Sequence, residues 1–205
     1  MRQYRLNEDI VLRRRSPEAL HQARVGLRRL RSALTLFKPV VEDERYSHFR
    51  DELKWLAGEL GDVRDLDVLY DRARSSELRI AIARLREGAY GALEDTLGSA
   101  RARALMIDLA EWVAVGAWRD SDQATAGENS IGAFATHALD KSFRKFKKRS
   151  EGLAGLSDEH RHEVRKLAKK LRYGSEFLAG LYTGKKAAKR HSRFIDGLQA
   201  VQDQL

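Results

Sequence analysis

Apolar positions recur at helical spacing along most of the chain, and two prolines, Pro17 and Pro39, frame the clearest example. Between them the apolar side chains follow at intervals of four and three residues: Ala23, Leu27, Leu30, Leu34 and Phe37. This spacing predicts an α-helix with one buried face. Ser16 can cap its start, and Pro17 suits the first helical position. We expect the helix to end at Lys38, because Pro39 cannot continue it.

The same spacing predicts further helices in the rest of the sequence. They are expected at roughly 43–60, 65–73, 76–98, 101–118, 131–150, 158–182 and 186–205, with a short one at about 5–14. Gly61 is expected to end one of them, and Asp62 or Asp65 to begin the next. No stretch shows the alternation of a half-buried strand. The predicted fold class is therefore all-α.

An internal repeat joins the two halves of the chain. The segment SPEALHQARVGLRRLR, from Ser16, aligns without gaps to SDEHRHEVRKLAKKLR, from Ser157, at an offset of 141 residues. The shared pattern is S-x-E-x2-H-x2-R-x3-[RK]-[RK]-L-R, and two copies with the same cap, histidine and basic spacing indicate a repeat. The last residues, FIDGLQAVQDQL, resemble those leading to Leu60, so we expect the second copy to be truncated at its C-terminus.

A polar stretch separates the two copies. DSDQATAGENS, at 120–130, has no apolar periodicity and is predicted to be a linker. The expected organisation is a first helical-bundle repeat at 1–119 and a second at 131–205. The second repeat carries 17 basic and 8 acidic side chains, a net charge of +9.

Each copy of the repeat places basic residues along one side of its helix. At about 100° per residue, His21, Arg28 and Arg31 fall within about 60° of Arg24, and the apolar stripe centres about 100° to one side. We call His21, Arg24, Arg28 and Arg31 the first basic strip, and the matching His162, Arg165, Lys169 and Arg172 the second basic strip.

The second basic strip runs beside its own apolar stripe of Val164, Ala168, Leu171 and Leu178. Both strips are therefore predicted to lie at the edge of a groove between helices. Arg29 and Lys170 point elsewhere and are interpreted as ordinary surface charges.

A basic strip of this kind can bind an anionic chain. It offers about one cation per helical turn, about 5.4 Å apart, and the first basic strip contains no acidic residue to relieve the repulsion. Arginine forms bidentate pairs with phosphate oxygens, and lysine adds a mobile charge. The alternative interpretation is a solvated charged face, or arginines paired with acids from other helices.

Two other segments offer candidate contacts. In the segment 53–69, Lys54 and Arg64 are predicted to point into the same groove, with Asp65 and Asp67 holding arginine side chains in place. A plain corner between two helices, with local ion pairs, explains the two aspartates equally well. In the helix at 131–150, a third basic strip of Lys141, Arg144, Lys145 and Lys148 is predicted, and a solvated surface is the alternative.

Composition narrows the class of partner. Lys and Arg number 39 against 30 Asp and Glu, for a formal charge of +9 and a pI near 9.9. This balance favours polyphosphate, nucleic acid or an anionic membrane. The absence of cysteine excludes disulfides and thiol catalysis. The start lacks an apolar segment and the most apolar stretch contains Asp108 and Glu111, so we expect no signal peptide, no membrane span and a cytoplasmic location.

No catalytic set, cofactor motif or metal site is predicted. The sequence contains no phosphate-binding glycine loop and no G-x-S-x-G. His160 and His162 diverge on a helix, and no H-E-x-x-H pair occurs. His21 and His162 are interpreted as hydrogen-bond donors to phosphate, or as residues that form a structural hydrogen bond at the start of their helix. Aromatic residues are sparse in the basic strips, so a stacking platform for single-stranded nucleic acid is not evident.

Three motifs in order, HQARVGLRRLRSALTLF, ELKWLAGELGDVRDLDVL and HEVRKLAKKLRYGSEFL, resemble the CHAD family, the conserved histidine α-helical domain. The resemblance covers nearly the whole chain. It implies two pseudo-symmetric antiparallel four-helix bundles packed around a basic central groove that holds inorganic polyphosphate. It also implies a binding module without catalysis of its own, sometimes joined to a triphosphate-tunnel (CYTH) domain.

Carried over to this sequence, the resemblance implies a set of polyphosphate contacts. They are His21, Arg24, Arg28, Arg31, Lys54 and Arg64 in the first half, and His162, Arg165, Lys169 and Arg172 in the second, to which Arg144 and Lys148 of the third basic strip are added. The leading hypothesis is a polyphosphate-binding module that targets proteins to polyphosphate granules. The alternatives are a nucleic-acid-binding helical protein, and an accessory domain of an enzyme that processes polyphosphate or triphosphate.

Overall fold

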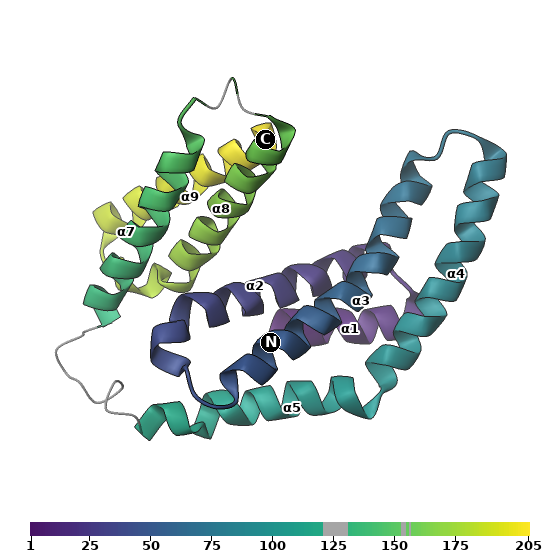
Figure 1. The fold of residues 1–205 in the computed structure, drawn as a ribbon, viewed down its shortest axis with the longest axis horizontal. Helices are drawn as coiled ribbons and strands as arrows, with labels where there is room; N and C mark the ends of the chain where they lie inside the picture. Colours follow the sequence, from purple (N-terminus) through teal and green to yellow (C-terminus); the bar gives the residue numbers. More distant parts are fainter. Residues whose placement is uncertain (121–130, 153–154, 156) are drawn as a thin grey trace. The chain divides into compact units, whose positions relative to one another are not determined.

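The computed structural model describes residues 1–120, 131–152, 155 and 157–205, and these residues form helices and no strand. The elements in chain order are α1 (Arg2–Arg14), α2 (Pro17–Val41), α3 (Tyr46–Arg72), α4 (Ser76–Gly98), α5 (Ala100–Val115), η1 (Ala117–Asp120), α7 (Ile131–Ser150), α8 (Asp158–Phe177), η3 (Ala179–Leu181) and α9 (Lys185–Gln204) (Figure 1). The predicted all-α fold class is confirmed.

The chain divides into two compact units. The first comprises Met1–Leu34 and Lys38–Ser121, and the second comprises Thr35–Phe37 and Asp122–Leu205. A linker is expected at 120–130, and residues 121–130 lie outside the described part of the chain. The expected boundaries of the two repeats, and their packing around a central groove, stay predictions.

The start of α2 is as predicted, and its end is not. Ser16 caps the helix, its side-chain oxygen accepting a hydrogen bond of 3.2 Å from the backbone N–H of Ala19. The helix continues through Pro39 to Val41, so the predicted end at Lys38 is wrong. Pro39 lies in the last turn, where the missing N–H removes one hydrogen bond and no further turn depends on it.

The helix α3 runs unbroken from Tyr46 to Arg72, and the predicted pair of helices at 43–60 and 65–73 is wrong. Gly61 does not end a helix, and neither Asp62 nor Asp65 begins one. An interior glycine costs about 1 kcal/mol relative to alanine. Burial of a continuous apolar face outweighs that cost here, because Leu53, Leu56, Leu60 and Val63 are all buried on either side of it.

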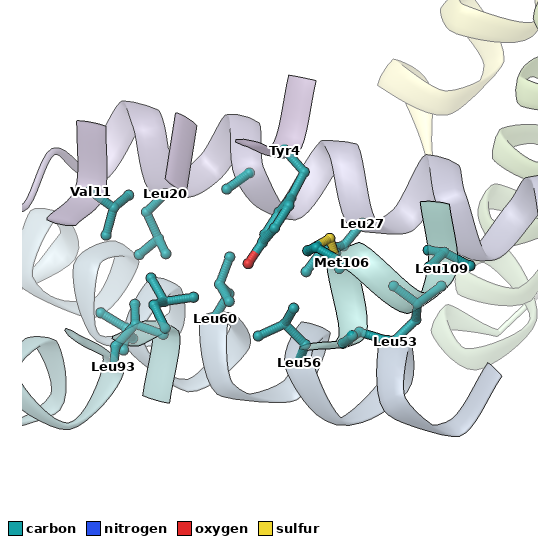
Figure 2. Close-up of a cluster of buried hydrophobic side chains, with 14 of the residues drawn as sticks. Tyr4, Val11, Leu20, Leu27, Leu53, Leu56, Leu60, Leu93, Met106 and Leu109 are labelled. Atoms are coloured by element: carbon teal, nitrogen blue, oxygen red, sulfur yellow. The ribbon is translucent and has the colours of Figure 1, made fainter. Parts of the chain in front are cut away.

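The core of the first unit draws on each of the helices α1 to α5. Its buried members include Tyr4, Leu27, Leu60, Leu93 and Leu109, which converge in Figure 2. In the apolar stripe predicted for α2, Ala23 and Leu27 are buried, and Leu30 and Leu34 pack against the same core. The predicted buried face of α2 is therefore confirmed from Ala23 to Leu34, whereas Phe37, the last residue of the predicted stripe, is partly buried and lies outside this core.

The backbones of α1 and α2 lie close together at Gly26. A Cβ atom at this position would lie 3.0 Å from the backbone nitrogen of Tyr4 and 3.2 Å from its Cα. Tyr4 itself is fully buried, and its hydroxyl donates a hydrogen bond of 2.8 Å to Glu8. Glycine at position 26 therefore allows backbone-to-backbone packing of the two helices.

In the described part of the second unit, α7, α8 and α9 pack around a small core. Its buried residues are Ala168, Leu171 and Leu198. Ser157 caps α8, accepting a hydrogen bond of 3.4 Å from the backbone N–H of His160, as Ser16 does for α2. The helix predicted at 158–182 ends earlier, at Phe177, and a short 3-10 turn follows it.

Among the described residues, no helix is long and apolar enough to cross a membrane.

Candidate functional site: a basic face of α2 against α3

The first basic strip lies at the edge of the packed face of α2, as predicted. His21, Arg24, Arg28 and Arg31 are all partly buried. Next to them on the same helix, Ala23 and Leu27 have no exposed surface. The strip is therefore partly shielded from solvent and not a fully solvated face.

Arg24 is seated on α3 at Gly61. A Cβ atom added to Gly61 would lie 2.6 Å from Nη1 of Arg24, 3.7 Å from Cζ and 3.9 Å from Nη2. These atoms are its three nearest neighbours outside the local helix backbone. The guanidinium thus occupies the space that any other side chain at position 61 would need.

Two nitrogens of the first basic strip are buried without a hydrogen-bond acceptor. They are Nη1 of Arg24 and Nε of Arg28. Neither arginine forms a salt bridge with an acidic side chain of the described residues. A buried donor left unsatisfied carries its full desolvation penalty, about 1–3 kcal/mol and more for a charged group. Within the described residues, neither donor has an acceptor that would offset this penalty.

Charges on α3 act on Arg24 in both directions. Its pKa is lowered, first by burial and then by Arg28 and Arg64, while Asp65 and Asp62 raise it. The first basic strip itself contains no acidic residue, but Glu18 of α2 acts on His21, and α3 brings two carboxylates near Arg24. They neutralise part of the charge without hydrogen-bonding to the guanidinium.

His21 belongs to the same cluster of charges. Burial lowers its pKa most, and Arg64, Arg28 and Arg24 lower it further, against a smaller opposite effect of Glu18. An imidazole so placed is neutral near pH 7. A bound anion would reverse the local field and favour the imidazolium.

The candidates on α3 divide between this cluster and the helix surface. Arg64 is partly buried, with 26% of its side chain exposed, and acts on both His21 and Arg24. Lys54 is exposed. Its charge lowers the pKa of Asp51, after the larger effects of Arg50. The structure brings Arg64 to the first basic strip, and nothing in it brings Lys54 there.

Asp67 is held by α4. It is buried, and it accepts hydrogen bonds of 3.0 and 2.6 Å from Nε and Nη2 of Arg86 and one of 2.9 Å from the Tyr90 hydroxyl. Nη1 of Arg64 lies 4.0 Å from the same carboxylate. Asp67 therefore does hold arginine side chains, within a continuous helix and without the corner proposed as the alternative.

The second basic strip is more open than the first. His162 and Arg165 are exposed, whereas their counterparts His21 and Arg24 are partly buried. Lys169 and Arg172 are partly buried. Arg172 pairs with Glu176, lies over the Tyr173 ring at 4.8 Å and keeps a buried Nε without an acceptor. Burial of Val164, Ala168, Leu171 and Leu178 confirms the predicted stripe beside it.

The third basic strip is exposed. Lys141, Arg144, Lys145 and Lys148 of α7 all face solvent, in agreement with the solvated alternative. Lys145 also lines a hollow that α7 shares with α8, together with Arg149, Lys166 and Lys170. Lys170 thus points away from the second basic strip, as predicted.

Two residues near the first basic strip differ from the sequence-based expectation. Arg29, expected to be an ordinary surface charge, is partly buried. Gly61, expected to end a helix, lies inside α3. Apolar residues keep the 3-4-3 spacing across it, from Leu53 to Val63, and this continuity predicts an uninterrupted helix with the glycine inside it.

The described residues form helices and no strand, and α2 carries a partly buried basic face, so the chain is an all-α protein. The family model of the CHAD domain matches residues 1–205, and the chain belongs to this family. Among solved structures it is similar to the crystal structure of the CHAD domain from the plant Ricinus communis. The two share 31% sequence identity over 98% of this chain and 68% of that chain, with a TM-score of 0.80. A comparison with curated proteins gives no match.

Proposed function

We propose that this chain binds inorganic polyphosphate through its basic strips, without transforming it. The observation that carries the proposal is the pair of buried guanidinium nitrogens, Nη1 of Arg24 and Nε of Arg28, that have no acceptor. Phosphate oxygens are strong acceptors, and arginine binds them in charge-assisted pairs. A phosphate chain along α2 would satisfy both donors at once.

The spacing of the strip supports a chain as ligand more than a single ion. Basic side chains on one side of a helix recur about every 5.4 Å, so a polymer can contact Arg24, Arg28 and Arg31 together, while a single phosphate contacts one or two of them. The net charge of +9 favours the same kind of partner. Membership of the CHAD family, for which the sequence motifs implied a polyphosphate groove, adds to this support.

A titration with polyphosphates of several lengths tests the proposal. Affinity should rise with chain length and fall steeply with salt, because binding releases counterions. Orthophosphate should bind weakly. DNA serves as competitor, and displacement of polyphosphate by DNA at equal phosphate concentration would favour the nucleic-acid-binding alternative instead.

Charge reversal locates the site. We expect Arg28→Glu and Lys169→Glu to weaken polyphosphate binding by on the order of tenfold or more each, about 1.4 kcal/mol. Arg14→Glu, at an exposed position of α1, makes the same change in net charge and serves as control. Equal affinity of all three variants would remove the basic strips from the site.

Absence of catalysis is part of the proposal and has its own assay. Purified protein incubated with polyphosphate should release no orthophosphate. Release that Arg24→Ala abolishes would replace binding by an enzymatic function. A fluorescent fusion of the chain should collect on polyphosphate granules in cells that form them, and Arg28→Glu should disperse it.

A further inference from the structure

We infer that Gly61 is a positioning residue of the basic site on α2. Because glycine has no side chain, position 61 leaves the space in which the Arg24 guanidinium lies; we call this space the seat of Arg24. The inference rests on the proposed function. Gly61 contributes no charge and no hydrogen-bonding side chain, so it acts only through the arginine on the neighbouring helix.

The geometry limits what a side chain at position 61 would disturb. The three atoms nearest to an added Cβ all belong to the Arg24 guanidinium, the closest at 2.6 Å. No backbone atom of another helix is among them. Substitution would therefore displace the end of a flexible side chain and leave the packing of α2 on α3 in place.

The seat matters because it fixes the direction of the guanidinium. Nη1 of Arg24 is buried and Nε of Arg28, one turn further along α2, is buried too, each without an acceptor. Donors held in place before the ligand arrives lose less conformational entropy on binding. A displaced Arg24 would lose this orientation, and Asp62 and Asp65 would compete with the ligand for its charge.

Gly58 provides a matched control on the same helix. It lies three residues before Gly61, is exposed, and has no atom within 4 Å of the place where its Cβ would stand. Alanine at either position raises helix propensity by the same amount. The two variants therefore share the change in helix propensity; they differ in the burial of the added methyl group and in its contact with Arg24.

The test is a double-mutant cycle read by polyphosphate affinity. Gly61→Ala should bind on the order of tenfold more weakly than wild type, while Gly58→Ala should bind as wild type does. In the Arg24→Ala background, which lacks the guanidinium, adding Gly61→Ala should change nothing. In the Arg24→Lys background, which also lacks Nη1, adding Gly61→Ala should likewise leave the affinity unchanged.

A spectroscopic measurement separates positioning from general disturbance. The Nε–Hε resonance of Arg24 should shift in Gly61→Ala and stay in place in Gly58→Ala. The melting temperature of Gly61→Ala should not fall below that of wild type. A lower melting temperature would overturn the inference, because it would mean that the added Cβ displaces more than a side-chain end.

The outcomes distinguish this inference from the proposed function. If wild type binds polyphosphate and Arg24→Ala weakens binding, but Gly61→Ala equals Gly58→Ala, the positioning role is wrong and the proposed function stands. A Gly61→Ala effect that persists in Arg24→Ala also overturns the role. If wild type does not bind polyphosphate, both fail.

Discussion

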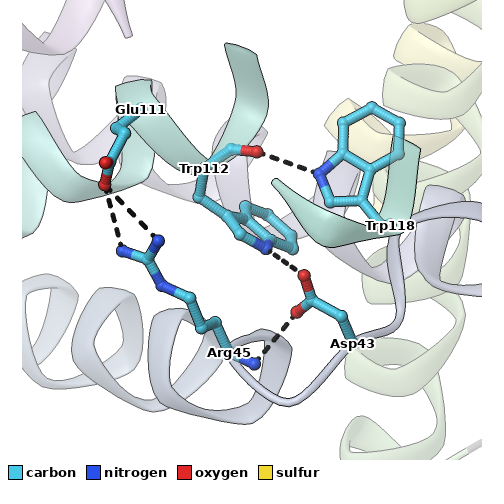
Figure 3. Close-up of polar contacts among 5 residues, drawn as sticks. All are labelled: Asp43, Arg45, Glu111, Trp112 and Trp118. Atoms are coloured by element: carbon cyan, nitrogen blue, oxygen red, sulfur yellow. Dashed lines mark hydrogen bonds and ion pairs between the residues drawn. The ribbon is translucent and has the colours of Figure 1, made fainter. Parts of the chain in front are cut away.

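The indole nitrogen of Trp112 donates a hydrogen bond of 2.7 Å to the carboxylate of Asp43 (Figure 3). The other carboxylate oxygen accepts from the backbone N–H groups of Arg45 and Tyr46, at 2.9 and 3.1 Å. One aspartate thus satisfies free N–H groups at the start of α3 and an indole buried in α5. The Arg45 guanidinium reaches Glu111 of α5 at 3.4 Å, which adds a second link between the same elements.

Removal of this carboxylate should destabilise the first unit. We expect Asp43→Ala to lower the free energy of unfolding by about 2–3 kcal/mol, because two backbone N–H groups at the start of α3 and the Trp112 nitrogen lose their acceptor. Urea denaturation followed by tryptophan fluorescence measures the loss. Glu44→Ala, at the exposed neighbouring position, should change stability little. Equal stability of the two variants would show that the bond to Trp112 contributes nothing.

The buried carboxylate of Asp67 predicts a larger effect on stability. Asp67→Ala leaves the Arg86 guanidinium and the Tyr90 hydroxyl without their acceptor, and loss of one partner in such a cluster costs about 3 kcal/mol. Asp71→Ala, one turn further along α3 and exposed, is the control. Thermal unfolding compares them, and a difference below about 0.5 kcal/mol would contradict a structural role for Asp67.

His21 predicts two effects of falling pH. The stability of the free protein should decrease, and the affinity for polyphosphate should increase. The pKa of His21 in the folded chain is lowered by burial and by Arg64, Arg28 and Arg24. The unfolded chain therefore takes up a proton at this position first, at about pH 6.5. As pH falls through this value, wild type should lose stability relative to His21→Gln.

Bound polyphosphate should reverse this sign, because its negative charge favours the imidazolium of His21. Affinity should then rise between pH 8 and pH 6 more in wild type than in His21→Gln. The difference between the two cancels titration of the ligand itself. His48→Gln, an exposed position on α3, should follow wild type. Parallel pH curves for wild type and His21→Gln would remove the histidine from the site.

The two sides of α8 allow a test of the second basic strip at constant net charge. Arg165 lies on the strip and Lys170 lines the hollow toward α7, and both are exposed. We expect Arg165→Glu to weaken polyphosphate binding by about tenfold and Lys170→Glu by less than about twofold. Isothermal calorimetry at fixed salt measures both. A larger loss in Lys170→Glu would move the site to the other side of the helix.

The pattern of apolar residues predicted most helices and their buried faces, since packing of one face decides where a helix lies. It failed where single residues were given too much weight. Pro39 and Gly61 are poor helix formers, yet each sits inside a helix. At Gly61 the cost is about 1 kcal/mol, and burial of Leu56, Leu60 and Val63 outweighs it. At Pro39 the cost is small because the proline lies in the last turn of α2.

The candidate site was predictable as a set of residues on one helix, because the basic strip follows from helical spacing alone. Its contacts across α3 were not. Whether Arg64 or Lys54 approaches Arg24 depends on how α3 is rotated against α2, and this is decided by packing. The charges of Asp62 and Asp65 near Arg24 depend on the same rotation.

The close approach at Gly26 specifies how the first helix docks. Along the packed face of α2 this gap admits the backbone of one residue of α1, Tyr4. A shift of α1 by one residue would move it about 1.5 Å along its axis and turn each side chain by about 100°, replacing the buried tyrosine with Gln3 or Arg5. The close approach at Gly26 and the burial of Tyr4 together therefore favour the observed alignment of α1 on α2.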